Sequence, residues 1–309
     1  MSTDAESSPS KLATRKILGG FPAPIILAPT AAPHKLTIIF LHGCGSNATK
    51  FHGPLLPTQV AGHGTFREAL CHARLVFPTA PLMRATKFRR SVIHQWYDGT
   101  GDWEPEARGN MRASVEYVHG MVRAEMGLVG GDARRIVLAG ISQGCAMALV
   151  SMLLWEGDPL GGVVGMCGFM PLSSSLMETL GGDSKKDTGE EADVVFEAEA
   201  GVDDVFDTAD TDDDSRSPLQ RAIDELREEV ELPGASSLST FSFHSTPVFL
   251  GHGTEDDKVE YEHGYQAAAL LEKMGVGVDF CAYQGLGHWY SPEMLEHIIS
   301  FLASKLDVW

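Results

Sequence analysis

Residues 135–155 read Arg-Ile-Val-Leu-Ala-Gly-Ile-Ser-Gln-Gly-Cys-Ala-Met-Ala-Leu-Val-Ser-Met-Leu-Leu-Trp. The first six residues are a short, mostly apolar run that predicts a buried β-strand, and the last thirteen, rich in Ala, Met and Leu, predict a helix. Between them lies Gly140-Ile-Ser-Gln-Gly144, a GxSxG sequence in the strand–turn–helix context of a nucleophile elbow. Because this turn is sharp, its flanking positions must be small, and the hydroxyl of Ser142 is pushed outward. The stretch predicts an α/β protein in which Ser142 is the nucleophile.

Further strands and helices are expected on both sides of this stretch. Short apolar runs predict strands at Leu36–Leu41, Arg74–Phe77, Gly162–Phe169, Thr246–Gly251 and Val278–Tyr283. Helices are expected at about 108–126, 259–274 and 291–306; in the first of them one face carries Met111, Val115, Val118 and Val122. Strands that alternate with helices predict βαβ units and a central, mostly parallel sheet flanked by helices.

A serine hydroxyl is a weak nucleophile until a neighbouring base takes its proton. His288 lies directly after the last predicted strand, in a loop expected at the same edge of the sheet as the elbow. We predict that His288 is the base, with an ordinary surface-loop histidine as the alternative. His42 and His252 each end a strand before a glycine and are interpreted as structural.

The acid that orients the base is expected after the preceding strand, in agreement with the chain order Ser, Asp or Glu, His. Three adjacent carboxylates compete there, Glu255, Asp256 and Asp257. Its role is to bond the imidazole N–H and to stabilise the imidazolium. We favour Asp256 over Asp257, with Glu255 third; a solvated acidic turn without a catalytic member is the alternative.

An oxyanion hole needs backbone N–H groups aimed at the developing charge. One is expected from Gln143, the residue after the nucleophile, and the other from Cys44, whose flanking glycines free the backbone. An ordinary glycine-rich turn is the alternative for the second group. Cys145 as a rival nucleophile is out of register with the elbow and is expected to pack in the helix.

Composition limits the classes of function. The chain has 309 residues, 43% of them hydrophobic, and a net charge of −18, which argues against nucleic acid as a partner. Five scattered cysteines without a CxxC pair argue against a disulfide framework and a structural zinc site. Neither a signal peptide nor a membrane-spanning run is recognised. We expect a cytoplasmic protein without stable membrane insertion, and the oligomeric state stays open.

One acidic segment interrupts the alternation of strands and helices. Residues 183–231 hold about 19 acidic and about 5 basic side chains, and the composition of the first half predicts disorder. The second half predicts a helix at 217–231 with an apolar stripe of Leu219, Ile223, Leu226 and Val230. This helix is expected either to cover the substrate site as a lid or to pack on the flank of the sheet. The predicted organisation is a flexible tail at 1–16 and one domain at 17–309 with an acidic, partly disordered insertion at about 172–245.

Together these residues resemble the acyl-protein thioesterase and carboxylesterase group of α/β-hydrolases, also described as lysophospholipase-like. The matching pieces, in the family's order, are Leu41-His-Gly-Cys-Gly45, Phe77-Pro-Thr-Ala-Pro81, Gln95-Trp-Tyr-Asp98, Gly140-Ile-Ser-Gln-Gly144, His252-Gly-Thr-Glu-Asp-Asp-Lys-Val259 and Gly287-His288. The family pattern HGxxDxxV places the acid on Asp256. The Trp-Phe/Tyr-Asp element lines the acyl groove in the family, so Trp96 is a candidate substrate contact, with an ordinary buried aromatic as the alternative. Cys145, where the family usually has Gly, and the acidic insertion depart from the pattern.

The resemblance implies hydrolysis of a carboxylic ester or thioester through an acyl-enzyme, without a metal or cofactor. The expected substrate is an acylated protein or a small lipid-like ester, as for a depalmitoylating thioesterase or a lysophospholipase. Two alternatives stay open: a general short-chain carboxylesterase, and a non-catalytic ligand receptor on the same fold. The presence of a nucleophile, an acid and a base argues against the receptor.

Overall fold

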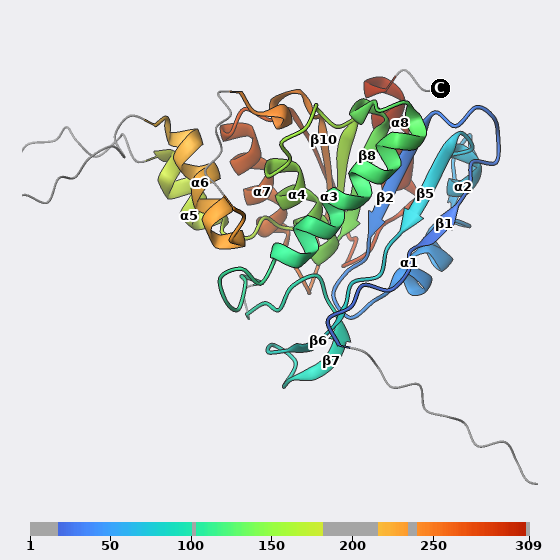
Figure 1. Cartoon of the computed structure of the whole chain (residues 1–309). Helices are drawn as coiled ribbons and strands as arrows, with labels where there is room; N and C mark the ends of the chain where they lie inside the picture. The colour runs from blue at the N-terminus through green and yellow to red at the C-terminus, as the bar shows by residue number, and fades with distance from the viewer. Residues whose placement is uncertain (1–17, 101–102, 182–215, 234–239, 307–309) are drawn as a thin grey trace, which may run out of the picture.

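A computed structural model describes residues 18–100, 103–181, 216–233 and 240–306 of the chain. Its centre is a seven-stranded sheet in the order β1-β5-β2-β8-β9-β10-β11 (Figure 1). The strands are β1 Ile25–Leu27, β2 Leu36–Leu41, β5 Ala73–Phe77, β8 Ile136–Ile141, β9 Gly162–Met166, β10 Val248–Gly253 and β11 Val278–Tyr283. Only β1 runs antiparallel to its neighbour, so the prediction of a mostly parallel sheet is confirmed.

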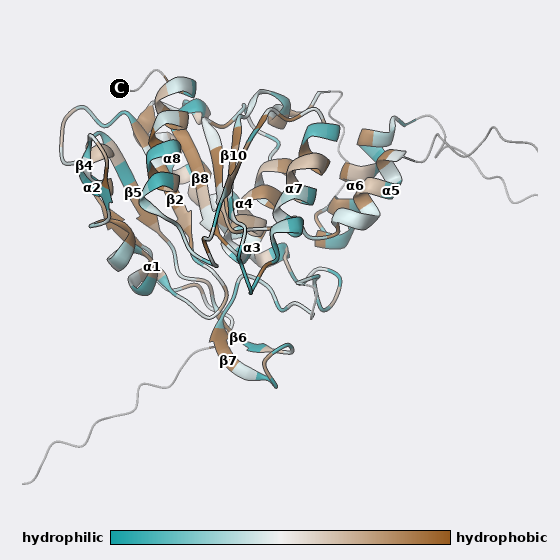
Figure 2. Cartoon of the chain, turned by 180° about the vertical axis from the view of Figure 1, so that it is seen from behind, coloured by the Kyte–Doolittle hydropathy of each residue, from teal (hydrophilic) through white to brown (hydrophobic). Residues whose placement is uncertain are grey.

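Helices cover both faces of this sheet. They are α1 Ala48–Leu55, α2 Phe66–Ala69, α3 Arg112–Met126, α4 Gln143–Leu153, α5 Ser173–Gly181, α6 Pro218–Val230, α7 Tyr261–Lys273 and α8 Pro292–Lys305, with 3-10 turns η1 Gly127–Val129, η2 Ala133–Arg135 and η4 Ser242–Ser245. Side chains of β2 alternate between two cores, since Ile39 packs with α3 and α4 whereas Ile38 packs with α1 and α8. Figure 2 shows hydrophobic strands between helices of mixed character.

Two short hairpins lie outside the main sheet, and the sequence patterns did not predict them. One pairs β3 (Gln59–Val60) with β4 (Gly64–Thr65), and the other pairs β6 (Leu82–Ala85) with β7 (Ser91–His94). The second projects from the body of the molecule (Figure 1). Strands of two to four residues carry too few side chains for a period to be recognised.

Most element boundaries agree with the sequence patterns to within a few residues. The predicted strand Gly162–Phe169 ends early, at Met166, because Cys167 takes a φ of +46° and turns the chain away from the sheet. The helix expected from 108 begins only at Arg112, and the apolar stripe that predicted it is buried.

The described parts of the predicted insertion include helices α5 and α6, which pack against each other beside α7 (Figure 1). Ser217 caps α6 by accepting from the backbone N–H of Gln220, and Pro218 occupies its first turn. Ile223, Leu226 and Val230 are buried in the core cluster that also contains Leu176 of α5. This burial favours the flank position over a lid, because the stripe is already covered.

Several predictions fall on other parts of the chain. The tail at 1–16 and the segments 182–215 and 234–239 of the insertion lie outside the described residues. Within the ranges that the structure describes, no helix has both the length and the apolarity needed to cross a bilayer.

Candidate active site

Ser142 sits in a strained turn between β8 and α4. Its φ of +56° and ψ of −126° are rare for a residue with a side chain, and its N–H donates to Met166 O at 2.9 Å. A Cβ on Gly140 would lie 2.3 Å from the carbonyl carbon of Gly144, and a Cβ on Gly144 would lie 2.2 Å from Leu41 O. Only glycine at these two positions lets α4 begin so close to β8 and β2. The turn is the sharp elbow that the GxSxG sequence predicts.

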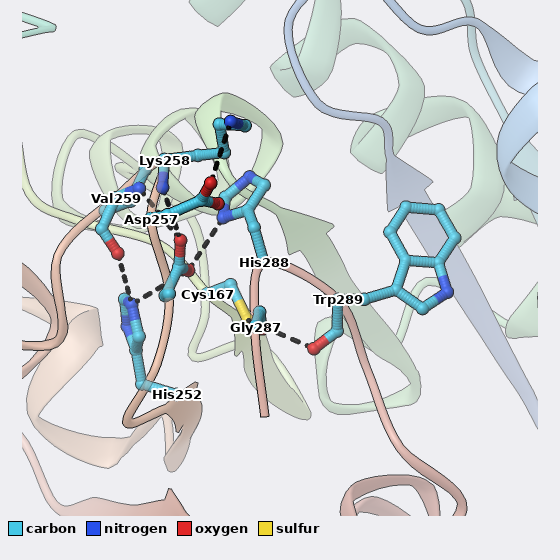
Figure 3. Close-up of polar contacts among 9 residues, drawn as sticks. Cys167, His252, Asp257, Lys258, Val259, Gly287, His288 and Trp289 are labelled. Atoms are coloured by element: carbon cyan, nitrogen blue, oxygen red, sulfur yellow. Dashed lines mark hydrogen bonds and ion pairs between the residues drawn. The ribbon is translucent and has the colours of Figure 1, made fainter. Parts of the chain in front are cut away.

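His288, in the loop after β11, donates from Nδ1 to Oδ2 of Asp256 at 2.7 Å (Figure 3). The imidazole is 20% exposed, whereas the carboxylate of Asp256 is 0% exposed. This bond assigns the neutral ring's proton to Nδ1 and leaves Nε2 free to accept a proton. The structure therefore brings together the histidine and one of the three carboxylates considered from the sequence.

Asp256 is held by donors on both of its oxygens. Oδ1 accepts from the N–H groups of Lys258 at 2.9 Å and Val259 at 3.0 Å, while Oδ2 accepts from His288 and lies 3.2 Å from Nε2 of His252. Burial alone raises the pKa of Asp256, but the bonds from His252, His288, Val259 and Lys258 together hold it well below its usual value. The carboxylate is ionised across the neutral range.

The neighbouring carboxylates face solvent instead. Asp257 is paired with Lys258 at 3.0 Å on the surface, and Glu255 is exposed. In the described chain neither Asp257 nor Glu255 forms a hydrogen bond with His288. Burial separates Asp256 from its two neighbours, and burial is the property that a run of three adjacent acids in a sequence does not reveal.

His252 contributes more to this site than its sequence position indicates. Its Nε2 lies 2.9 Å from Val259 O and 3.2 Å from Oδ2 of Asp256, so the proton on Nε2 is shared between the two acceptors. The ring is buried against the backbone of α7, where a Cβ on Gly264 would lie 2.1 Å from Nδ1. The sequence signal for the contact of His252 with Asp256 was their spacing of four residues, which spans the end of β10.

The loop after β2 lies against the nucleophile. A Cβ on Gly43 would lie 3.8 Å from Ser142 Oγ, and Gly45, with a φ of +77°, donates its N–H to His94 O at 2.7 Å. Within the described ranges, no turn, loop or side-chain acceptor is found for the N–H groups of Cys44 and Gln143. Two unengaged N–H groups flanking a serine are what an oxyanion site requires.

A layer of bonds fixes this loop and the elbow to the segment around Trp96. The side chain of Gln143 accepts from Trp96 N at 2.9 Å and donates to Tyr97 O at 2.8 Å. The indole N–H of Trp96 donates to His42 O at 2.7 Å. Trp96 is only 1% exposed, so in this structure it supports the loop after β2 and offers almost no surface to a ligand.

His42 has the structural environment that its position suggested. Nε2 accepts from Ala80 N at 3.0 Å and Nδ1 donates to Gly43 O at 2.8 Å. Burial lowers the pKa of His42 to about 4, so the ring is neutral with a fixed tautomer. His42 thus holds the loop after β2 in place. Because both of its ring nitrogens are bonded to the backbone, it has no nitrogen available for proton transfer.

The end of β9 contacts both Ser142 and the loop of His288, and in the described chain no hydrogen bond joins these two residues. Met166 binds the N–H of Ser142, and Cys167 directs its thiol at Trp289 O, 3.2 Å away, in the loop of His288. A hydrogen bond between a catalytic serine and its histidine is often long before substrate binds and shortens in the complex. Cys145, the rival nucleophile, is buried, and burial raises the pKa of its thiol to about 12.

One set of side chains in the described ranges has the composition of a metal site. Cys167, Asp256 and His288 each offer a ligand atom, and these atoms all lie within 4.8 Å of one another. Asp256 and His288, which the sequence predicts as the acid and the base, are thus two of the three candidate ligands.

Two family models match the chain. The model described as phospholipase/carboxylesterase matches residues 23–188, and that of the prolyl oligopeptidase family matches residues 188–308. The chain is 26% identical over 284 residues to acyl-protein thioesterase 1 of Debaryomyces hansenii, covering 91% of this chain and 95% of the relative. It is 24% identical over 276 residues to the carboxylesterase SOBER1 of Arabidopsis thaliana, covering 87% and 90%.

A solved structure resembles the fold as well. The crystal structure of Zea mays acyl-protein thioesterase 2 superposes with a TM-score of 0.58 at 20% identity, over 91% of this chain and 98% of that one. At this identity the likeness bears on the fold alone, which is that of an α/β-hydrolase.

Proposed function

The chain belongs to the phospholipase/carboxylesterase family, and from this membership we propose that it hydrolyses carboxylic thioesters or esters through an acyl-enzyme on Ser142. The resemblance inferred from the sequence motifs is thereby confirmed at the level of the family. The names of the relatives, acyl-protein thioesterase and carboxylesterase, support a thioester or ester as the scissile bond.

The observation that carries the proposal is the hydrogen bond of His288 to the buried carboxylate of Asp256, at the sheet edge that holds the strained serine. An ionised carboxylate bonded to Nδ1 leaves Nε2 as the only proton acceptor of the ring. A receptor that only binds a ligand has no need of a strained serine, a buried acid and an oriented histidine together. We therefore favour the enzyme over the non-catalytic alternative.

The reaction follows from the roles of these groups. Ser142 Oγ attacks the acyl carbon while His288 Nε2 takes its proton, and the N–H groups of Cys44 and Gln143 bind the developing oxyanion. His288 then returns the proton to the departing thiol or alcohol, which leaves the acyl chain on Ser142. A water molecule attacks this acyl-enzyme with His288 again as base, and the carboxylic acid is released. Asp256 stabilises the imidazolium in both halves.

We propose an acylated protein as the substrate, as for a depalmitoylating thioesterase, with a lysophospholipid as the second candidate and a short-chain ester as the third. Trp96 acts in this scheme by holding the oxyanion loop. A reducing compartment such as the cytoplasm is the proposed location, supported by the absence of any disulfide among the five cysteines, all of which are free. We further propose that 17–309 form one domain, which both core clusters support.

A fluorophosphonate probe tests the role of Ser142. The wild type is expected to be labelled, and Ser142→Ala to lose the label and on the order of 10⁶ in kcat while staying folded. Ser151→Ala is the matched control, because Ser151 lies on α4 with a buried hydroxyl that has no partner in the described structure. A Ser142→Ala protein that keeps a tenth of wild-type turnover would refute the proposal.

Graded substrates then separate the three substrate classes. Thioesters and oxygen esters of matched acyl chains, from two to sixteen carbons, should be compared by kcat/KM. A value that rises with chain length for thioesters supports the thioesterase, whereas a maximum at the shortest esters supports the carboxylesterase.

A further inference from the structure

We propose that a zinc ion binds between Cys167, Asp256 and His288 and inhibits the enzyme by occupying its base. The inhibition rests on the proposed function, but the binding does not. The proposed mechanism has no use for the thiol of Cys167, although it lies beside the two residues that orient and carry the proton (Figure 3).

The donor set and its spacing fit zinc. Thiolate, imidazole and carboxylate are the ligands that zinc accepts in proteins, at about 2.0–2.3 Å from the metal. Tetrahedral ligation at these lengths separates the donor atoms by roughly 3.3–3.6 Å. Here the three ligand atoms lie within 4.8 Å of one another, and two of them, His288 Nδ1 and Asp256 Oδ2, are already 2.7 Å apart. Zinc binding therefore requires the His288–Asp256 pair to open slightly and any donor atoms that are farther apart to approach.

The surroundings hold the ligands in place. Cys167 ends β9 with a φ of +46°, and its sulfur lies 3.2 Å from Trp289 O in the loop that carries His288. Asp256 keeps two backbone donors on Oδ1, which orient the carboxylate, while Oδ2 exchanges its hydrogen bond from His288 for the metal. His288, the most exposed of the three, provides the route of entry, and a water completes the coordination.

Without a metal the thiol is protonated and inert, since burial raises the pKa of Cys167 to about 12. Zinc binding releases this thiol proton to solvent, so Zn–S replaces S–H without any change of oxidation state. At Nδ1 the metal confines the proton of His288 to Nε2; at Nε2 it occupies the lone pair directly. In either case the lone pair that accepts the proton of Ser142 is lost, and turnover stops.

The first experiment measures inhibition of short-ester turnover at buffered free zinc concentrations. Wild type and Cys281→Ala, whose thiol lies in β11 outside the cluster, are expected to share one midpoint of inhibition. Cys167→Ala is expected to keep turnover and to need at least tenfold more zinc. Cys167→Ser serves the same purpose if the alanine variant is poorly soluble. An unchanged midpoint in Cys167→Ala or Cys167→Ser overturns the proposal.

The second experiment detects the metal without turnover. Cobalt(II) is added to Ser142→Ala protein, which keeps all three ligands but is expected to be inactive. A thiolate-to-cobalt charge-transfer band is expected, and it should be absent from Ser142→Ala/Cys167→Ala and present in Ser142→Ala/Cys281→Ala. No band in Ser142→Ala, or the same band without Cys167, contradicts the site. Binding with a failed Ser142 assay would leave the zinc site standing and remove only the proposed function.

Discussion

Replacing Gly264 by alanine tests whether His252 supports the carboxylate of Asp256. Gly264 lies in α7, and a Cβ there would be 2.1 Å from Nδ1 and 2.9 Å from Cγ of His252. The ring cannot move freely, because it is 1% exposed and its other nitrogen is bonded to Val259 O and directed at Asp256. The methyl group therefore displaces either the helix or the imidazole.

The magnitude follows from two opposing effects. Overpacking a buried site destabilises by roughly 1–3 kcal/mol, whereas Gly→Ala in a helix contributes up to about 1 kcal/mol of stability. Gly120→Ala in α3 isolates the second effect, because a Cβ there meets nothing within 4 Å. For a domain of this size 1 kcal/mol shifts Tm by roughly 2 °C. Gly264→Ala should melt roughly 2–6 °C below Gly120→Ala.

Turnover should fall together with stability. Loss of a hydrogen bond to a charged carboxylate corresponds to about 1.5–3 kcal/mol, so kcat should fall by roughly 10- to 150-fold. KM should change little, since His252 is buried and offers no surface to a substrate. Calorimetry and steady-state kinetics on the two variants measure both quantities. If Gly264→Ala and Gly120→Ala have equal Tm and equal kcat, the support of Asp256 by His252 is refuted.

Further perturbations probe the acid, its ionisation, a buried ion pair and the insertion. Asp256→Asn should lower kcat by roughly 10⁴, while Asp257→Asn stays within a few-fold; reversed results would move the acid by one residue. Because the pKa of folded Asp256 is lowered, its carboxylate stabilises the fold above about pH 4, and this contribution is lost as the pH falls through the folded pKa. Acid unfolding of Asp256→Asn should therefore be less steep, and an identical profile would contradict the assignment. Arg74→Ala leaves the largely buried Glu125 without its ion-pair partner, 2.8 Å away. Because Arg74 is partly exposed, the free energy of unfolding in urea should fall by less than the roughly 3–5 kcal/mol of a fully buried pair, with kcat unchanged. Replacing 183–215 by a short Gly/Ser linker should keep short-ester kinetics within a few-fold, and loss of soluble protein would argue that this segment belongs to the fold.

The candidate residues whose placement could be predicted best from the sequence are those that depend on local geometry. Ser142 could be predicted because a sharp strand-to-helix turn demands glycines at fixed positions on both sides. His288 followed from its place after a strand at the same edge. Asp256 needed the family pattern as well, since choosing among three neighbouring acids depends on burial. The contact of His252 with Asp256 was missed because it depends on how β10 packs against α7, which no short pattern encodes.

The position of Trp96 shows a second limit of sequence patterns. An aromatic residue in a recurring motif can line a groove or support a loop, and its spacing along the chain is the same in both cases. Its bond to His42 O exists only because β2 and the segment after β7 meet in space. The short strands β1, β3 and β4 were missed for the opposite reason, because their partners, rather than their own side chains, define them.

The close packing of the elbow divides the site into halves that differ in local stability. Ser142 is bound into three core elements, β2, β8 and α4, whose backbones approach too closely for even a methyl group. His288, by contrast, lies in a loop at the end of the last strand of the sheet. Amide hydrogens around Ser142 should therefore exchange only through global unfolding, whereas those around His288 should exchange through small local openings. On gradual heating the loop of His288 should therefore lose its ordered position before the turn of Ser142 does.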